Sequence, residues 1–104
     1  MNIDEIIHNI KSDKYIFSNH AEVERKEDEL EVVEVEEAIV NGNIIEDYPR
    51  DPRGESCLIL GFSGEKPIHV VCGWNSDGWL LIITVYIPKP PKWLTPTKRG
   101  KGGK

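Results

Sequence analysis

Two of the three histidines in this sequence stand where an imidazole could transfer protons. His20 lies at the predicted start of a helix, where free N–H groups and the positive end of the helix dipole favour a bound phosphate and a neutral imidazole. His69 lies within a predicted strand, between Ile68 and Val70. Each also has a structural interpretation: His20 as an exposed residue beside a helix cap, and His69 as a buried, hydrogen-bonded histidine. The third, His8, falls off the apolar face of its predicted helix and is expected at the surface.

The strand register decides which groups surround His69. If residues 75–78 form a four-residue turn, His69 pairs directly with Thr84, and Tyr86 lies diagonal to it. These three residues then form a polar cluster on one face of the sheet. The other face is predicted to be apolar and to carry Ile68, Val70, Cys72, Trp74, Trp79, Leu81, Ile83 and Val85. A shift of one residue in the turn would reverse both faces.

The same pairing rule, applied to a four-residue turn before the strand that carries His69, places two further pairs of residues across from one another. Ser56 would face Gly73 on the His69 side of the sheet, and Cys57 would face Cys72 in the core. A disulfide between the two cysteines is geometrically possible, although a cytoplasmic location argues against it. Two cysteines are too few for a disulfide framework or a cysteine-based zinc site, so we expect no metal and no cofactor.

Positively charged side chains that could hold a phosphate occur in two places. Arg50 and Arg53 lie in the loop before the second predicted strand. Loop arginines can bind phosphate through two parallel hydrogen bonds, although they often only face water. Lys92 and Trp93 would extend such a surface from the other end. The segment 22–37 is rich in carboxylates, which indicates a solvated helix face, since their spacing does not suit a metal site.

Length and charge limit the class of protein. With 104 residues the chain suits one domain, predicted over 1–97 and followed by a disordered basic tail, 98–104. The net charge is −5 and the tail holds four positive charges, so residues 1–97 carry −9. An acidic body is a poor match for general nucleic-acid binding and favours a protein partner or a few localised cations. Because no apolar run approaches the ~20 residues of a membrane helix and no signal peptide is recognisable, we expect a cytoplasmic protein.

The apolar periodicity predicts helices first and strands afterwards. Predicted helices span 3–10 and 20–41, the second with a break near 28–30 and a stop at 41–43; predicted strands span 44–48, 57–62, 68–74 and 79–87. The prolines of 88–92 should run extended, after which Trp93 packs back on the body. We therefore predict an α+β fold with the N-terminal helices packed on one face of a four-stranded antiparallel sheet.

Several separate blocks resemble, in order, the domain of unknown function numbered 4258. The blocks span about residues 15–93 and are His20-Ala21, Val35-Glu36-Glu37-Ala38-Ile39, Gly42, Ile45-Glu46-Asp47-Tyr48-Pro49, Ser56-Cys57-Leu58-Ile59-Leu60-Gly61, Pro67-Ile68-His69-Val70-Val71, Ile83-Thr84-Val85-Tyr86 and Trp93. The resemblance implies a RelE/barnase-like domain similar to the RelE and MqsR ribonuclease toxins, often encoded beside an antitoxin.

The resemblance also implies which residues would form a site. The motif positions are occupied by His20, Tyr48, Ser56, His69, Thr84, Tyr86 and Trp93. One departure is Glu24, where many members carry an arginine. Arg25 or Arg50 would then have to bind phosphate in its place.

Three functions are compatible with these residues. The first is a metal-independent endoribonuclease toxin acting on mRNA, with His20 or His69 as base and acid, Tyr86 as a positioning or proton-donating group, and Arg50 or Arg53 as phosphate clamp. The second is a non-catalytic module that binds a protein partner through a sheet edge or the acidic helix. The third is RNA binding without cleavage, through the basic tail and Arg50 or Arg53. The sequence leaves the oligomeric state open.

Overall fold

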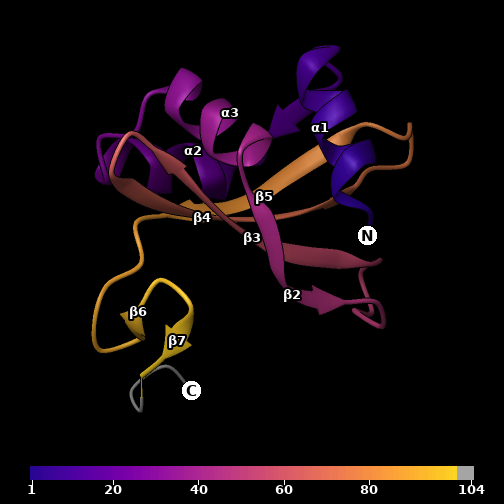
Figure 1. Ribbon diagram of the computed structural model, residues 1–104. Coiled ribbons are helices and arrows are strands. Elements are labelled where there is room, and N and C mark those ends of the chain that lie inside the picture. The colour runs from indigo at the N-terminus through magenta and orange to yellow at the C-terminus, as the bar shows by residue number, and fades with distance from the viewer. Residues whose placement is uncertain (101–104) are drawn as a thin grey trace.

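Three helices lie on one face of a five-stranded mixed sheet in the computed structural model, which describes residues 1–100 (Figure 1). The elements in chain order are α1 (Ile3–Lys11), β1 (Tyr15–Phe17), α2 (Asn19–Glu27), α3 (Val32–Val40), β2 (Asn43–Tyr48), β3 (Ser56–Ser63), β4 (Lys66–Trp74), β5 (Leu80–Tyr86), β6 (Trp93–Thr95) and β7 (Lys98–Arg99). The strand order is β1-β5-β4-β3-β2, and β6 and β7 form a small hairpin on the side of the sheet away from the helices (Figure 1).

The helix boundaries follow local capping chemistry. Asn2 caps α1 by accepting the N–H groups of Asp4 and Glu5. The long acidic segment breaks as predicted: α2 ends at its C-cap Asp28, and α3 begins after a capping box between Glu31 and Glu34. The predicted stop at residues 41–43 is confirmed, since Asn41 is the C-cap of α3.

The predicted α+β class and the four predicted strands are confirmed, and the sheet gains one strand that the sequence did not reveal. This strand, β1, pairs in parallel with Leu80–Ile82 at the start of β5. Three residues are too few to show an alternating pattern, so β1 is recognisable only from its partner. The sheet is therefore mixed rather than wholly antiparallel.

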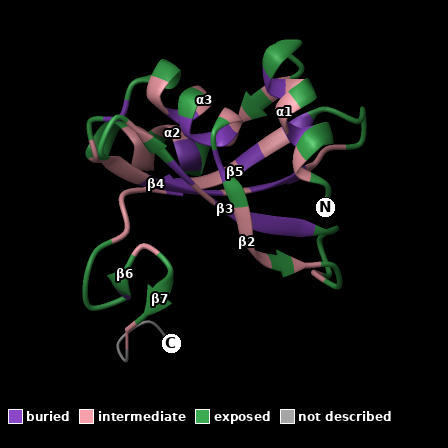
Figure 2. Ribbon diagram, viewed as in Figure 1, coloured by how far each residue is buried: buried purple, intermediate pink, exposed green. Residues whose placement is uncertain are grey.

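The main core fills the space between the helices and the sheet. Its buried residues are Ile6, Ile10, Ala21, Leu30, Val35, Ala38, Ile39, Cys57, Ile59, Ile68, Val70, Cys72, Leu80, Ile82 and Val85. Figure 2 shows this burial concentrated on the sheet and on the inner sides of the helices. Every main secondary-structure element from α1 to β5 except β1 and β2 contributes a fully buried side chain, so helices and sheet form one unit.

The register between β3 and β4 confirms the first turn prediction, and the register between β4 and β5 corrects the second. Ser56 faces Gly73 and Cys57 faces Cys72, as expected. Trp74, however, pairs with Leu80, and the pairing skips Ile83.

The bulge at Ile83 changes the neighbours of His69. His69 pairs with Tyr86, while Thr84 pairs with Val71. The predicted core positions Trp79, Leu81 and Ile83 were wrong; the buried core residues of β5 are Leu80, Ile82 and Val85. One extra residue in the strand lets β5 bury apolar side chains on both sides of the bulge.

The C-terminal segment returns to the sheet. Trp93 is buried, as predicted. We expected the disordered tail to begin at residue 98, but Lys98 and Arg99 form β7, and the rest of that tail, 101–104, lies outside the described residues. Within the described chain, no helix has the length and apolar character needed to cross a membrane.

Candidate functional site

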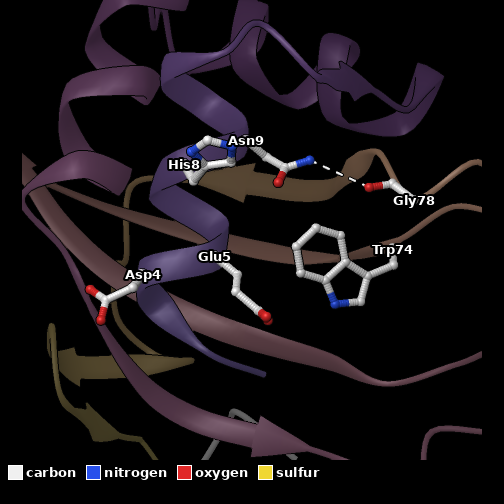
Figure 3. Close-up of a pocket in the computed structure, with 6 residues that line it drawn as sticks. All are labelled: Asp4, Glu5, His8, Asn9, Trp74 and Gly78. Atoms are coloured by element: carbon white, nitrogen blue, oxygen red, sulfur yellow. Dashed lines mark hydrogen bonds between the residues drawn. The ribbon is translucent and has the colours of Figure 1, made fainter.

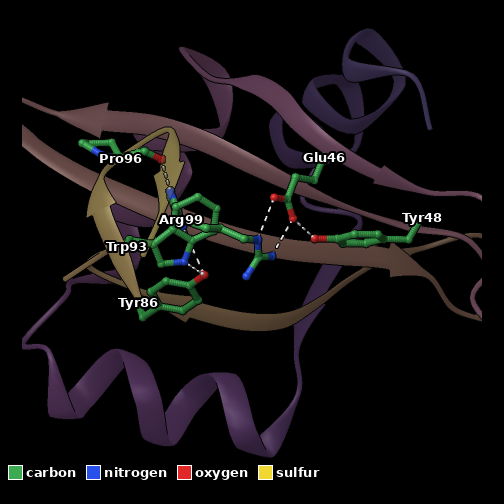
Figure 4. Close-up of polar contacts among 7 residues, drawn as sticks. Glu46, Tyr48, Tyr86, Trp93, Pro96 and Arg99 are labelled. Atoms are coloured by element: carbon green, nitrogen blue, oxygen red, sulfur yellow. Dashed lines mark hydrogen bonds and ion pairs between the residues drawn. The ribbon is translucent and has the colours of Figure 1, made fainter. Parts of the chain in front are cut away.

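His69 stands at the centre of a hydrogen-bonded cluster on the sheet face away from the helices. Its Nε2 lies 2.7 Å from the Pro96 carbonyl oxygen and its Nδ1 3.1 Å from the Tyr86 hydroxyl. Trp93 Nε1 donates to the same hydroxyl oxygen at 3.1 Å (Figure 4). Because a carbonyl only accepts, Nε2 carries the proton and Nδ1 accepts the Tyr86 hydroxyl proton. The chain of donors and acceptors is complete with a neutral imidazole.

The environment of His69 keeps it neutral and closed to solvent. The residue is fully buried, and the Trp93 ring meets the imidazole edge to face with the centroids 4.5 Å apart. Burial lowers the pKa of His69, and the hydrogen bond to Pro96 opposes that shift only in part. These are the contacts of a buried, hydrogen-bonded histidine, and both ring nitrogens are already used.

An ion pair closes the hairpin over this cluster. Arg99 binds Glu46 through two contacts, Nη2 to Oε1 at 2.7 Å and Nε to Oε2 at 3.0 Å, and Tyr48 donates its hydroxyl proton to the same carboxylate (Figure 4). The guanidinium also stacks 4.6 Å from the Trp93 ring centre. Arg99 lowers the pKa of Glu46, while burial and Glu46 raise the pKa of Tyr48 to about 12. Glu46 therefore stays ionised and holds both partners.

His20 lies in a different environment, at the edge of the sheet. Its side chain is 67% exposed, and its Nε2 is 3.3 Å from the Glu24 carboxylate oxygen Oε1, one helical turn away. Ser18 caps α2 and donates its hydroxyl proton to the Ile83 carbonyl at 2.9 Å, which ties the helix start to β5. His20 is thus an accessible imidazole beside a carboxylate.

Glu24 is itself held by the sheet. β1 pairs with one edge of β5, and this pairing extends only along residues 80–82. Beyond that point Glu24 accepts the Val85 N–H at 3.1 Å, and Asp28 accepts the Ile87 N–H at 2.8 Å. The acidic residue at position 24, which departs from the arginine expected from the resemblance, therefore caps a sheet edge and also lies beside His20.

The other predicted site residues are spread over the molecule. Arg25 is held by Glu22, by the Leu30 carbonyl and by the Phe17 ring, so its guanidinium serves the fold. Arg50 is exposed in the loop between β2 and β3. Thr84 is half-buried on β5. The structure brings His69, Tyr86 and Trp93 together and joins Tyr48 to them through Arg99, whereas His20 stands apart.

Asp51, beside a small cavity, connects two more of the predicted residues. Arg53 and Ser56 both bind Asp51, at 3.3 and 3.2 Å. Asp51 and Arg53 border a cavity of about 220 Å³ that Gly73 and Ile83 also line. It lies on the sheet side that also carries His69, since the residues of β4 alternate between faces. A side chain at Gly73 would fill part of this space, because its Cβ would lie 3.5 Å from the Ile83 side chain.

Sequence reasoning missed Glu46, Pro96 and Arg99. Glu46 and Tyr48 share a strand face at a spacing of two, which was a usable signal. Arg99 was assigned to the disordered tail. A backbone carbonyl acceptor such as that of Pro96 cannot be recognised in a sequence, because every residue has a backbone carbonyl. Within residues 1–100, no group of three or more His, Cys, Asp and Glu side chains is arranged to hold a metal.

Comparison with known families places the chain. The family model described as Domain of unknown function (DUF4258) matches residues 17–87. The chain belongs to this family. The DUF4258 match includes His20, His69 and Tyr86 but ends before Trp93 and Arg99, so the hairpin that closes over His69 lies outside it. Searches among curated proteins and among solved structures gave no match.

Proposed function

We propose that this DUF4258 protein is a metal-independent endoribonuclease of the toxin–antitoxin type, with His20 as its general base. The observation that carries the proposal is the pairing of an exposed imidazole with a fixed carboxylate: His20 Nε2 lies 3.3 Å from Glu24 Oε1. An imidazole oriented by a carboxylate is a recurring arrangement for proton transfer. His69 lacks the accessibility for this role, because it is buried and both its nitrogens are bound.

In this proposal the two nitrogens of His20 have different roles. The neighbouring Glu24 carboxylate favours a proton on Nε2, and the Nδ1 lone pair would then accept the proton of a ribose 2′-hydroxyl. The 2′-oxygen then bonds to the adjacent phosphorus, the bond to the 5′-oxygen breaks, and the leaving 5′-oxygen takes up a proton from water. A 2′,3′-cyclic phosphate remains. Glu24 stabilises the imidazolium that forms, and the Val85 N–H keeps the carboxylate in place.

The positive charge that a phosphate needs is available near the same strand. Lys92 is exposed, and its Nζ lies 5.6 Å from the centre of the Tyr86 ring. Tyr86 is two residues beyond Thr84 on β5. In this proposal the hydrogen bonds among His69, Tyr86 and Trp93 have a positioning role, because they fix the segment that carries Lys92. Arg53, at the rim of the small cavity, would contact a neighbouring part of the RNA.

The test is cleavage of several single-stranded RNAs in excess EDTA by protein freed of any co-purifying partner. We expect products with 2′,3′-cyclic phosphate ends. His20→Ala should reduce the rate by about 10²–10⁴-fold, the usual contribution of one general acid or base. His8→Ala is the matched control, because His8 is an exposed histidine on another helix. Cleavage that persists at the wild-type rate in His20→Ala would remove His20 from the mechanism.

A second candidate, a non-catalytic module that binds a protein partner, is favoured by the outer surface of α2 and α3. Val23 and Val33 are 56% and 66% exposed there among acidic side chains. Glu34 is engaged by Lys66, so Glu37 is the cleaner position for charge reversal. If no RNA is cleaved, a partner lost on Glu37→Lys and at high salt, but retained in His20→Ala, would favour this candidate.

A further inference from the structure

A cavity of about 540 Å³ lies between α1 and the turn that joins β4 to β5, away from both histidine sites described above (Figure 3). It is lined by Asp4, Glu5, His8, Asn9, Trp74 and Gly78. The pocket is wide open to solvent, so a small molecule bound there would keep part of its surface exposed. Neither the proposed chemistry at His20 nor the His69 cluster uses any of these residues.

The fold holds the walls of this cavity in place. Glu5, His8 and Asn9 share one side of α1 because they are three and four residues apart, while Ile6 and Ile10 anchor the other side in the core. Asn9 donates from Nδ2 to the Lys14 carbonyl at 3.1 Å and to the Gly78 carbonyl at 3.4 Å, and so links α1 to the turn (Figure 3). The opening is therefore part of the folded structure rather than a loose surface.

Trp74 supplies an aromatic wall that lacks a cation. Three other rings of the molecule already carry one: Arg25 lies over Phe17, Lys92 over Tyr86, and Arg99 over Trp93. No such contact involves Trp74 in the described part of the chain. The indole is only half-buried and borders the cavity, so a ligand can reach its face.

The charge of the cavity is negative. Asp4 and Glu5 contribute two carboxylates, and none of the lining residues is a lysine or arginine. Neither carboxylate has an ion-pair partner among residues 1–100. In Figure 3 the Glu5 carboxylate extends from α1 on the side that faces the indole.

We propose that this cavity binds a small molecule through a guanidinium or ammonium group, held between the Trp74 ring and the Glu5 carboxylate, with Asp4 adding to the negative charge of the lining. An aromatic face beside carboxylates is the arrangement that recognises organic cations, because the ring quadrupole and the charges attract the same group. The inference does not depend on the ribonuclease proposal, since none of its residues belongs to the His20–Glu24 pair or to the His69 cluster.

The test is titration of the full chain with agmatine, a small molecule with a guanidinium at one end and an ammonium at the other. Binding is followed by calorimetry and by the indole N–H signal of Trp74 in nuclear magnetic resonance spectra. Butylurea, a neutral analogue of the guanidinium end, is the matched ligand control. We expect agmatine to bind and to shift the Trp74 signal, and butylurea to bind at least about tenfold more weakly.

Two variants locate the site. The double change Asp4→Asn, Glu5→Gln keeps the side-chain size and should weaken agmatine binding about tenfold through lost charge. Trp74→Leu should weaken it similarly, and Trp79→Leu, an exposed tryptophan outside the cavity, should not. Equal affinity for agmatine and butylurea, or unchanged binding in the double variant, would overturn the proposal. Binding of a lysine- or arginine-rich peptide with no response to agmatine would do the same, because it would make the site a protein-docking surface.

Discussion

The two faces of the sheet are covered in different ways. On one face, three helices bury a continuous apolar core that includes Val35, Ile39 and Ile59. On the other, a short hairpin is held by few residues: Trp93, one neutral histidine and the Arg99–Glu46 ion pair. Apolar packing scales with area and tolerates the loss of any single polar contact, whereas a hydrogen-bonded network depends on every member. The comparison suggests that the helical face sets global stability and that the hairpin face opens first.

One glycine on each face permits a comparison of the same substitution. A Cβ at Gly61 would lie 1.7 Å from the Ala38 carbonyl oxygen, where α3 crosses β3. A Cβ at Gly100 would lie 1.9 Å from the Pro91 carbonyl oxygen, within the hairpin segment. Gly61→Ala must displace a core helix, so we expect it to lower the free energy of unfolding by about 3 kcal/mol or more.

Gly100→Ala should leave global unfolding nearly unchanged, because only the hairpin end has to move. Denaturant unfolding measures the first effect, and acrylamide quenching of the buried Trp93 fluorescence measures the second. Gly64→Ala serves as a control, since nothing lies within 4 Å of its Cβ and only its positive φ of 61° opposes the change. Equal global losses in Gly61→Ala and Gly100→Ala would show that both faces belong to one cooperative unit.

The helices could be predicted from the sequence, whereas the side of β5 that faces them and most contacts of the hairpin could not. Isoleucine spacing, the caps and the turn between β3 and β4 are local features, so they predicted the helices, the break near residue 28 and the β3–β4 register. The bulge at Ile83 depends on which residues of β5 the helices bury. The one feature of the nearby sequence that indicates it is the spacing of three between the buried residues Ile82 and Val85. The contacts of His69 with Pro96 and of Glu46 with Arg99 join residues 27 and 53 positions apart, and no periodicity reports them.

The candidate site shows the same limit. His20 and His69 were both identifiable by type, and their structural interpretations, an exposed His20 and a buried His69, match the observed access. The contacts that cause this difference, at the hairpin and at the edge of β5, were not predicted. Position 24 lacks the arginine that the resemblance led us to expect and instead carries a carboxylate that accepts the Val85 N–H and lies beside His20.

The pH dependence of stability tests whether His69 is the weak point of the hairpin face. Its pKa is lowered by burial, so the unfolded chain binds the proton more readily. Stability is therefore fully present above the ordinary histidine pKa of about 6.5 and is lost as the pH falls below it. We expect the thermal midpoint of the wild-type protein to drop from about pH 7.5 to about pH 5.

His69→Gln removes the titrating group, so the variant should start lower but show a flatter profile over the same pH range. Carboxylates whose pKa is lowered, such as Glu46 and Glu34, contribute their own loss below their ordinary pKa, so the His69 component is the one seen at the higher pH. If the slope is the same with and without His69, the hairpin is not weakened by protonating it.

The smallest expected effect concerns the ion pair at the outer end of the hairpin. Arg99→Lys keeps the charge but loses the two-point contact with Glu46 and the flat stack on Trp93. Because Arg99 is 43% exposed at its side chain, we expect a loss of no more than about 1 kcal/mol. The change should appear as faster hydrogen exchange at the Trp93 indole and leave the core amides of β3 and β4 unaffected. Exchange that accelerates equally at both would mean that the ion pair supports the whole sheet, and the distinction between the two faces would fail.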